Sequence, residues 1–239
     1  MKIMIGLLHQ DWLQHNLVES LLKLRDKYPE HSIEFYFSSA RPIDYNRNKI
    51  VEYFLSTDNE VLFMMDSDMV IDPNILDMIK EGHDVVSATV FSLMQGIPYP
   101  IIMKLDVEKK NYTPMYDPKD EITEYTPVDG IGTGCIYIRR PVFDKIKPPY
   151  FRFEQDGDGA ITMGEDYYFS KKALAAGIQP YVATEFVVGH FKTFDAAHFN
   201  QLLYKALNFN KGGIAHTLSA RLDPESAKKL KEKLQNAKA

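Results

Sequence analysis

Apolar and polar positions alternate between two patterns along the first ninety or so residues. Short continuous apolar runs, typical of buried strands, are separated by stretches in which apolar residues return every three or four positions, as on one face of a helix. Strands followed by helices predict an α/β fold with a largely parallel sheet. The expected strands are residues 2–8, 32–37, 61–65 and 84–91, and the expected helices are residues 14–27, 48–55 and one opened by Asp72 and Pro73.

The second half of the chain is patterned differently. Prolines, tyrosines and charges through residues 97–129 predict antiparallel strands and a mobile loop. A polar segment with several glycines precedes a helix that ends at Gly177, a typical cap residue. The remaining expected elements are strands at residues 130–139 and 181–188, and helices at residues 166–176, 195–208 and 223–237.

Composition narrows the class of protein. The 239 residues are 45% hydrophobic and 26% charged, with a formal net charge of −5, so nothing predicts general binding to nucleic acid or to an anionic membrane. A single cysteine, Cys135, excludes an intramolecular disulfide and favours a cytoplasmic location. The apolar N-terminus is short and soon polar, which predicts a first strand and not a signal peptide.

Asp66-Ser67-Asp68 is the main candidate for chemistry. It follows the apolar run 61–65, and a second apolar run, 69–71, comes directly after it. Two carboxylates two residues apart lie on the same side of an extended chain and make an oxygen-rich site that suits Mg²⁺ or Mn²⁺. A plain surface turn is the alternative, because Asp and Ser are ordinary turn residues.

Three further places carry candidate residues, each with a structural alternative. Glu165 and Asp166 begin a helix, where they either cap it or supply a general base. His190 follows a strand, as a metal ligand or as an ordinary histidine. Arg47 and Asn48 follow the second strand, as nucleotide contacts or as a solvated helix start with Asn48 as its cap.

The glycines of residues 130–134 superficially suggest a dinucleotide-binding loop. Their spacing is Gly-x-Gly-x-Gly, and the segment leads into the strand-like run 135–138 and not into a helix. The context therefore excludes that interpretation. Small residues such as Gly134 instead allow the backbone to lie close to a bound sugar.

Taken in order, these motifs resemble those of nucleotide-sugar glycosyltransferases of the GT-A fold, particularly family 2-like enzymes. The resemblance covers roughly residues 1–195 and implies a Rossmann-like mixed β-sheet flanked by helices. We therefore expect a catalytic domain at residues 1–205 and a C-terminal helical extension at residues 206–239. The matching segments are Arg47-Asn48, residues 62–69, Gly132-Thr133-Gly134 leading to residues 139–143, Gly164-Glu165-Asp166 and Gly189-His190.

The resemblance implies a role for each residue. Asp68 and His190 would bind Mn²⁺ or Mg²⁺, and Asp66 would contact the metal or the donor ribose. Asp166 would deprotonate the acceptor hydroxyl with inversion, and Glu165 is the alternative base or an acceptor contact. The donor is expected to be a nucleotide-diphosphate sugar, with an unknown acceptor, and its expected contacts are Arg47, Asn48, Asp66, Ser67 and Gly134.

Other functions fit parts of the pattern. A haloacid dehalogenase-like phosphatase also places Asp-x-Asp after an apolar strand, with Asp66 as nucleophile, but usually on the first strand. A nucleotidyltransferase would carry a glycine-rich loop with Arg or Lys after the first strand, where this chain has His9-Gln10-Asp11. A sugar-binding module without catalysis is a further alternative. The lysine-rich C-terminal helix is expected to be solvated, with a membrane-surface or homo-oligomer contact as the alternative.

Overall fold

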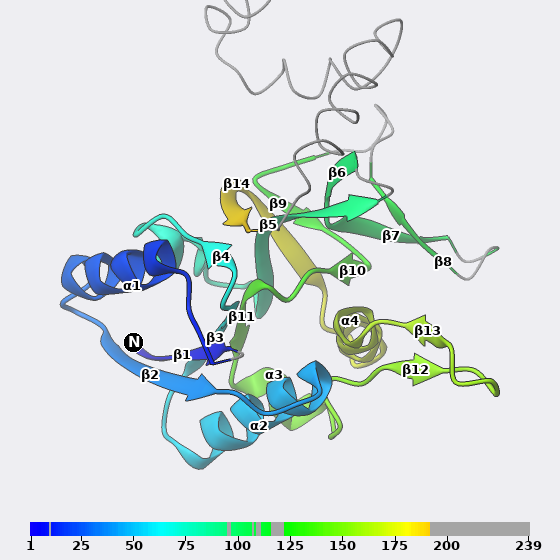
Figure 1. Ribbon diagram of the computed structural model, residues 1–239, viewed down its shortest axis with the longest axis horizontal. Coiled ribbons are helices and arrows are strands. Elements are labelled where there is room, and N and C mark those ends of the chain that lie inside the picture. Colours follow the sequence, from blue (N-terminus) through cyan, green and yellow to red (C-terminus); the bar gives the residue numbers. More distant parts are fainter. Residues whose placement is uncertain (10, 95–96, 107, 109–110, 116–121, 192–239) are drawn as a thin grey trace, which may run out of the picture. The chain divides into compact units, whose positions relative to one another are not determined.

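The computed structural model of the chain describes residues 1–9, 11–94, 97–106, 108, 111–115 and 122–191 (Figure 1). Strands and helices alternate in its first half, as the apolar pattern predicts. The elements are β1 (Lys2–Leu8), α1 (His15–Lys27), β2 (Ser32–Ser38), α2 (Ile43–Ser56), β3 (Val61–Asp66), β4 (Met69–Val70), the 3₁₀ helix η1 (Ile75–Met78), β5 (Val85–Met94), β6 (Ile97–Pro100), β7 (Ile102–Asp106), β8 (Asn111–Pro114), β9 (Tyr125–Pro127), β10 (Gly130–Ile131), β11 (Cys135–Arg139), α3 (Pro141–Lys145), β12 (Glu154–Gln155), β13 (Ile161–Met163), α4 (Glu165–Ala175) and β14 (Pro180–His190).

A mixed sheet runs through the described part of the chain, with its main path in the order β2-β1-β3-β11-β5-β14-β4. β1 pairs in parallel with β2 and with β3, whereas β11 is antiparallel to both of its neighbours. β14 is parallel to β5 and antiparallel to β4. The parallel arrangement of β1, β2 and β3 places their carboxyl ends at one edge of the sheet, where loops that carry function commonly lie.

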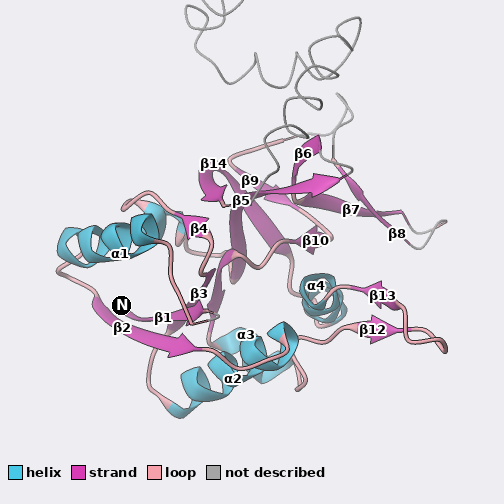
Figure 2. Ribbon diagram, in the orientation of Figure 1, coloured by secondary structure: helices cyan, strands magenta, loops and turns pink. Residues whose placement is uncertain are grey.

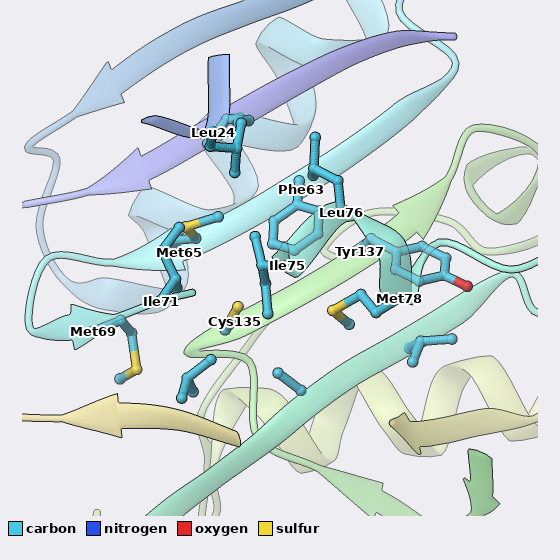
Figure 3. Packing of buried hydrophobic residues seen from close by; sticks show 14 of the residues in the cluster. Leu24, Phe63, Met65, Met69, Ile71, Ile75, Leu76, Met78, Cys135 and Tyr137 are labelled. Carbon is cyan, nitrogen blue, oxygen red and sulfur yellow. The ribbon is translucent and has the colours of Figure 1, made fainter. Parts of the chain in front are cut away.

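The two faces of this sheet bury two separate hydrophobic clusters. Successive side chains of a strand point to opposite faces, so Ile5 and Phe63 belong to one cluster and Met4 and Leu62 to the other. Helix α1 and η1 cover the first cluster, part of which Figure 3 shows. Helices α2, α3 and α4 supply the second, and Figure 2 shows α1 on one side of β1–β3 and α2 on the other. The sheet is therefore a middle layer between helices, which is the expected α/β arrangement.

Helix α2 begins at Ile43 and not at residue 48, so the expected start was wrong. Its first turn exposes Ile43 and Tyr45, and an apolar pattern cannot mark a turn whose apolar residues face solvent. Pro42 occupies the N-cap position, so Asn48 is not the cap. Arg47 and Asn48 consequently lie inside the helix and do not precede it.

The helix expected after Asp72 and Pro73 is only the short 3₁₀ helix η1. Its N-cap is Asn74, whose backbone N–H donates to Asp72 Oδ1 at 2.7 Å. Gly82, at φ 81°, turns the chain soon after η1 ends. Because 3₁₀ helices are short and the punctuating Pro73 and Gly82 are close together, no longer helix forms here.

The strand expected over residues 130–139 is interrupted. β10 pairs with β7 in a separate sheet, whereas β11 belongs to the central sheet. Between them, the carbonyl of Gly132 accepts a hydrogen bond from Ser87 Oγ at 2.6 Å, and that of Gly134 accepts one from the Asp66 N–H at 2.9 Å. Because these carbonyls accept hydrogen bonds from Ser87 and Asp66, they are not available for regular strand pairing across residues 130–139.

The elements described above belong, apart from the chain around residues 94–97, to one compact unit of residues 1–93 and 98–192. The expected helices at 195–208 and 223–237, the boundary at 205/206 and the proposed oligomer contact lie outside the described residues, as do 116–121 of the expected loop. Within the described residues, no helix is both long and apolar enough to cross a bilayer.

Candidate active site

The Asp66-Ser67-Asp68 turn joins the end of β3 to β4. Asp66 is the last residue of β3, and its N–H bond to the Gly134 carbonyl ties the turn to the segment between β10 and β11. All three residues of the turn are half-buried, and Ser67 accepts a backbone hydrogen bond from Gln14 at 3.3 Å. The carboxylates therefore stand at a fixed strand end and not on a freely solvated loop.

The structure places Asp68 and His190 together. The antiparallel pairing of β4 with β14 puts His190 opposite Met69, and the Phe191 N–H donates to the Asp68 carbonyl at 2.8 Å. The His190 Nε2 atom consequently lies 3.1 Å from Asp68 Oδ2. The His190 Nδ1 atom is 2.7 Å from the Phe91 carbonyl oxygen, which can only accept, so we assign the proton to Nδ1. Nε2 then faces the Asp68 carboxylate, in the orientation that metal-binding histidines adopt.

Arg47 lies at the centre of a second cluster. Its side chain projects from α2 and is only 2% exposed. Nη2 lies 3.1 Å from Asp66 Oδ1 and 3.2 Å from Oδ2, Nε lies 3.3 Å from Glu165 Oε1, and Nη1 donates to the Thr133 carbonyl at 3.2 Å. One guanidinium thus joins the ends of three segments that are distant in sequence.

Electrostatics keeps this arginine charged. Burial by itself disfavours the cation, but the carboxylates of Asp66 and Glu165 outweigh that effect and raise the pKa of Arg47. A buried charge without a partner costs several kcal/mol, by order of magnitude, so the arginine and its carboxylates depend on one another. Each of the three guanidinium nitrogens of Arg47 thus has a protein oxygen as its partner.

Glu165 and Asp166 open helix α4, within one residue of the expected start. Glu165 is buried and engaged by Arg47, whereas Asp166 is half-buried. Burial, and then the neighbouring Glu165 charge, raise the pKa of Asp166 to about 7, although a hydrogen bond from the Tyr167 N–H opposes the shift. Asp166 is therefore a carboxylate with the basicity that suits a general base near neutral pH.

Asn48 has a structural role. Its amide nitrogen donates to the Asp44 and Phe151 carbonyls, both at 2.7 Å, and its oxygen accepts from the N–H groups of Tyr150 and Phe151. All four hydrogen-bonding positions of the amide are filled by backbone. The side chain anchors the chain near residues 150–151 to helix α2.

Two glycines leave room for the acidic side chains. A Cβ on Gly134 would lie 2.9 Å from Met69 Cε and 3.4 Å from Asp66 Oδ2, and one on Gly164 would lie 2.8 Å from Asp166 Oδ1. Any larger residue would displace the neighbouring side chain. Gly134 thus has a steric reason to be at the expected donor site.

A surface pocket of about 420 Å³ lies beyond the ends of β1 and β2. Asp11 in its wall has φ 71°, a conformation that non-glycine residues rarely adopt and that clusters at ligand-binding loops. Trp12 and Phe37 are about half exposed, at 53% and 51%. Sequence reasoning missed this pocket, although the single tryptophan, four residues after the end of β1, was a usable signal. Its described lining is His9, Asp11, Trp12, Leu13, Val18 and Phe37.

The donor atoms fit a divalent cation in part. Within the described residues, no group of three or more His, Cys, Asp or Glu side chains is arranged to hold a metal ion. Asp68 and His190 form a pair, whereas Asp66 is turned toward Arg47. A carboxylate and an imidazole suit Mn²⁺ better than Mg²⁺, and such ions commonly complete their coordination with substrate phosphates and water. The pair would supply two protein ligands to such a site.

No family model and no curated protein matches this chain. Among solved structures, A197 from STIV is 21% identical, with 81% of this chain and 87% of that chain covered and a TM-score of 0.56. A glycosyltransferase involved in glycosylation of the major capsid of PBCV-1 aligns at 12% identity, 84% and 98% coverage and a TM-score of 0.41. A mutant Drosophila β1,4-galactosyltransferase 7 in complex with manganese, UDP-Gal and xylobiose aligns at 14% identity, 84% and 79% coverage and 0.45. Identities this low speak only to architecture: the chain shares its fold with A197 from STIV, and its own mixed sheet lies between helical layers.

Proposed function

We propose that the chain is a metal-dependent glycosyltransferase that moves a sugar from a nucleotide-diphosphate sugar to an acceptor hydroxyl. The observation that carries the proposal is the position of the Asp68–His190 pair. It lies beside a strand-end carboxylate, Asp66, which Arg47 links to the start of α4. Carboxylates of two kinds, one able to serve a cation and one able to take a proton, are what this transfer requires.

Asp68 and His190 hold the cation in this proposal, and Asp66 contacts the cation or the donor ribose. A bound Mn²⁺ or Mg²⁺ ion supplies Lewis-acid neutralisation of the departing diphosphate. The Nδ1–H bond to the Phe91 carbonyl fixes the ring of His190, so that Nε2 stays directed at the ligand position. Ser67 and Gly134 line the donor side of the turn.

Asp166 acts as the general base. It accepts the proton of the acceptor hydroxyl while the oxygen bonds to the anomeric carbon, and the bond from that carbon to the diphosphate oxygen breaks. Attack opposite the leaving group inverts the anomeric centre. Glu165 is less accessible, because it is buried and paired with Arg47, so we assign it to the support of this site.

In this proposal the nucleobase binds in the pocket at Trp12 and Phe37. Exposed aromatic rings beside a shallow concavity offer a stacking surface for a planar base. The strained backbone of Asp11 supports the same assignment, since strain is retained where function requires it. This position is at the carboxyl-end edge of the sheet, as is Asp66.

A phosphatase with Asp66 as nucleophile is less consistent with this geometry. Both Asp66 oxygens lie within 3.2 Å of the Arg47 guanidinium, and Asp66 is at the end of the third strand. A nucleophile must be free to approach phosphorus in line.

A thermal-shift screen of nucleoside diphosphates with and without Mn²⁺ tests the proposal. We expect one nucleotide to stabilise the protein only when Mn²⁺ is present, because a ligand that binds the folded state raises its stability. The Asp68→Asn variant should lose that shift. Absence of a shift with every nucleotide would count against the proposal, and Mg²⁺-dependent release of phosphate from a phosphomonoester, lost in Asp66→Asn, would replace it with the phosphatase.

A further inference from the structure

The guanidinium of Arg47 contacts three protein groups at once. Its partners are Asp66 at the end of β3, the Thr133 carbonyl between β10 and β11, and Glu165 at the start of α4, while its own backbone belongs to α2. The fixed geometry of a guanidinium allows such bridging, which a lysine ammonium on a flexible stem cannot reproduce.

The bridge is internal. With 2% of the side chain exposed and all three nitrogens directed at protein oxygens, Arg47 has no surface with which to bind a substrate. Yet it touches one carboxylate on the donor side and one that adjoins the base Asp166. Its position between the two halves of the site indicates an indirect role.

We propose that Arg47 is a positioning residue that fixes the donor-side carboxylate Asp66 and the acceptor-side start of helix α4 relative to each other. The inference rests on the proposed function for the meaning of the two sides, but the bridge itself is testable without any substrate. Movement of either segment would strain or break three charge-assisted or backbone contacts together, so the two sides behave as one unit.

The same contact limits the attraction of Asp66 for a cation. Nη2 lies within 3.2 Å of both Asp66 oxygens, and its charge offsets that of the carboxylate. Asp66 Oδ1 makes this ionic contact without a well-aligned hydrogen bond. Removing the guanidinium should therefore leave a more negative site, to which a divalent cation binds more tightly even as the site loses its geometry.

The variants Arg47→Met and Arg47→Lys separate charge from geometry. Arg140→Met is the matched control, because Arg140 likewise makes three hydrogen bonds, in its case to the backbone carbonyls of Asn59, Phe54 and Thr57, but contacts no residue of this site. The double variant Arg47→Met/Glu165→Gln keeps the net charge of the Arg47, Asp66 and Glu165 group at −1, and it preserves a testable protein where the single variant fails to fold.

The first probe is Mn²⁺ alone. Its binding is measured by the electron paramagnetic resonance signal of the free ion. We expect Arg47→Met to bind Mn²⁺ about threefold to tenfold more tightly than the parent, Arg47→Lys to stay within about twofold, and Arg140→Met to be unchanged. General structural damage would weaken binding, so weaker Mn²⁺ binding by a folded Arg47→Met would overturn the charge offset.

Hydrogen exchange is the second probe and needs no metal. We expect the amides of residues 165–169 and 133–134 to exchange at least tenfold faster in Arg47→Met, in the double variant and in Arg47→Lys, but not in Arg140→Met. Unchanged exchange at both segments would overturn the positioning role. A parent protein that binds no Mn²⁺ would instead contradict the proposed function. The exchange measurement would still show whether Arg47 holds the two segments in place.

Discussion

His190 Nε2 lies 3.1 Å from Asp68 Oδ2, although the two residues are separated by 122 positions in the chain. The contact exists because β14, the last described strand, pairs with the short strand β4 that follows the Asp66-Ser67-Asp68 turn. A histidine and an aspartate that meet at a strand end give the site both an imidazole and a carboxylate. The pairing is the structural basis of the proposed metal site.

Substitution of either member of this pair should weaken metal binding. We expect Asp68→Asn and His190→Gln each to reduce Mn²⁺ affinity by at least about tenfold, since each removes one protein donor of the proposed site. Calorimetric titration with Mn²⁺ measures the effect. Asp72→Asn, an exposed carboxylate four residues farther along, is the control and should bind as the parent does. Equal affinities for all four proteins would place the metal elsewhere.

Asp166→Asn should abolish most of the transfer activity. A positioned general base contributes about 10²–10⁴-fold in rate, and an amide cannot accept the proton. Because the pKa of Asp166 is raised to about 7, the activity of the parent should rise as pH increases through about 7, where the base becomes ionised. The rate of nucleoside diphosphate release across pH 5–9, in roughly half-unit steps, measures both effects. A profile without a rise near pH 7 would assign the base to another residue.

The raised pKa of Asp166 also predicts how stability depends on pH. The folded chain holds this proton more tightly than the unfolded chain, whose aspartates titrate near pH 4, so the proton favours folding most at low pH. Between pH about 4 and about 7 the stability that this proton contributes falls as pH rises. Above pH about 7 the buried Asp166 charge lowers the stability of the fold. Asp166→Asn removes that cost and should be about 1–2 kcal/mol more stable than the parent at pH 8, after discounting for partial solvent contact.

Urea unfolding at pH 5 and pH 8 measures this difference. The advantage of Asp166→Asn should be smaller at pH 5, where the parent carboxyl is protonated in the folded state. Asp158→Asn, an exposed aspartate of the β12–β13 loop, serves as control and should show no such pH-dependent gain. A variant less stable than the parent at pH 8 would show that the Asp166 charge is better solvated than its burial indicates.

Trp12→Ala should weaken nucleotide binding. Base stacking on an aromatic ring contributes about 1–3 kcal/mol, and Trp12 is a large exposed ring of the pocket at the end of β1. Leu22→Ala is the matched control, because Leu22 is an exposed apolar residue of α1 outside the pocket lining. The affinities of both variants are measured for the nucleoside diphosphate found by thermal shift. Equal losses of affinity in the two variants would contradict the assignment of the nucleobase to this pocket.

Gly6→Ala should destabilise the fold. A Cβ on Gly6 would lie 2.5 Å from Ile50 Cγ2, a fully buried side chain with little room to move, and overpacking of this kind costs about 1–3 kcal/mol. Gly157→Ala is the control, because no heavy atom lies within 4 Å of its Cβ position. Urea midpoints of the two variants measure the difference. A Gly6→Ala protein as stable as the parent would show that α2 can shift away from β1.

Elements whose apolar residues face the core were predictable from sequence. The runs 2–8 and 61–65 and the helix 14–27 coincide with β1, β3 and α1 to within a residue, because buried residues carry the period of the element. The first turn of α2 escaped prediction, since Ile43 and Tyr45 are exposed. The break between β10 and β11 escaped as well, because carbonyl partners on other strands leave no local signal.

The sequence by itself determined the layered α/β architecture and drew attention to Asp66, Asp68, Asp166 and His190 as chemical groups. Only the tertiary structure decided which of them meet: strand pairing joins Asp68 to His190, and one buried guanidinium joins Asp66 to Glu165. It also showed that Arg47 and Asn48, both expected donor contacts, hydrogen-bond to the protein's own backbone. The physical reason is that periodicity reports local burial, whereas a side chain's partners are set by the packing of segments far apart in the chain.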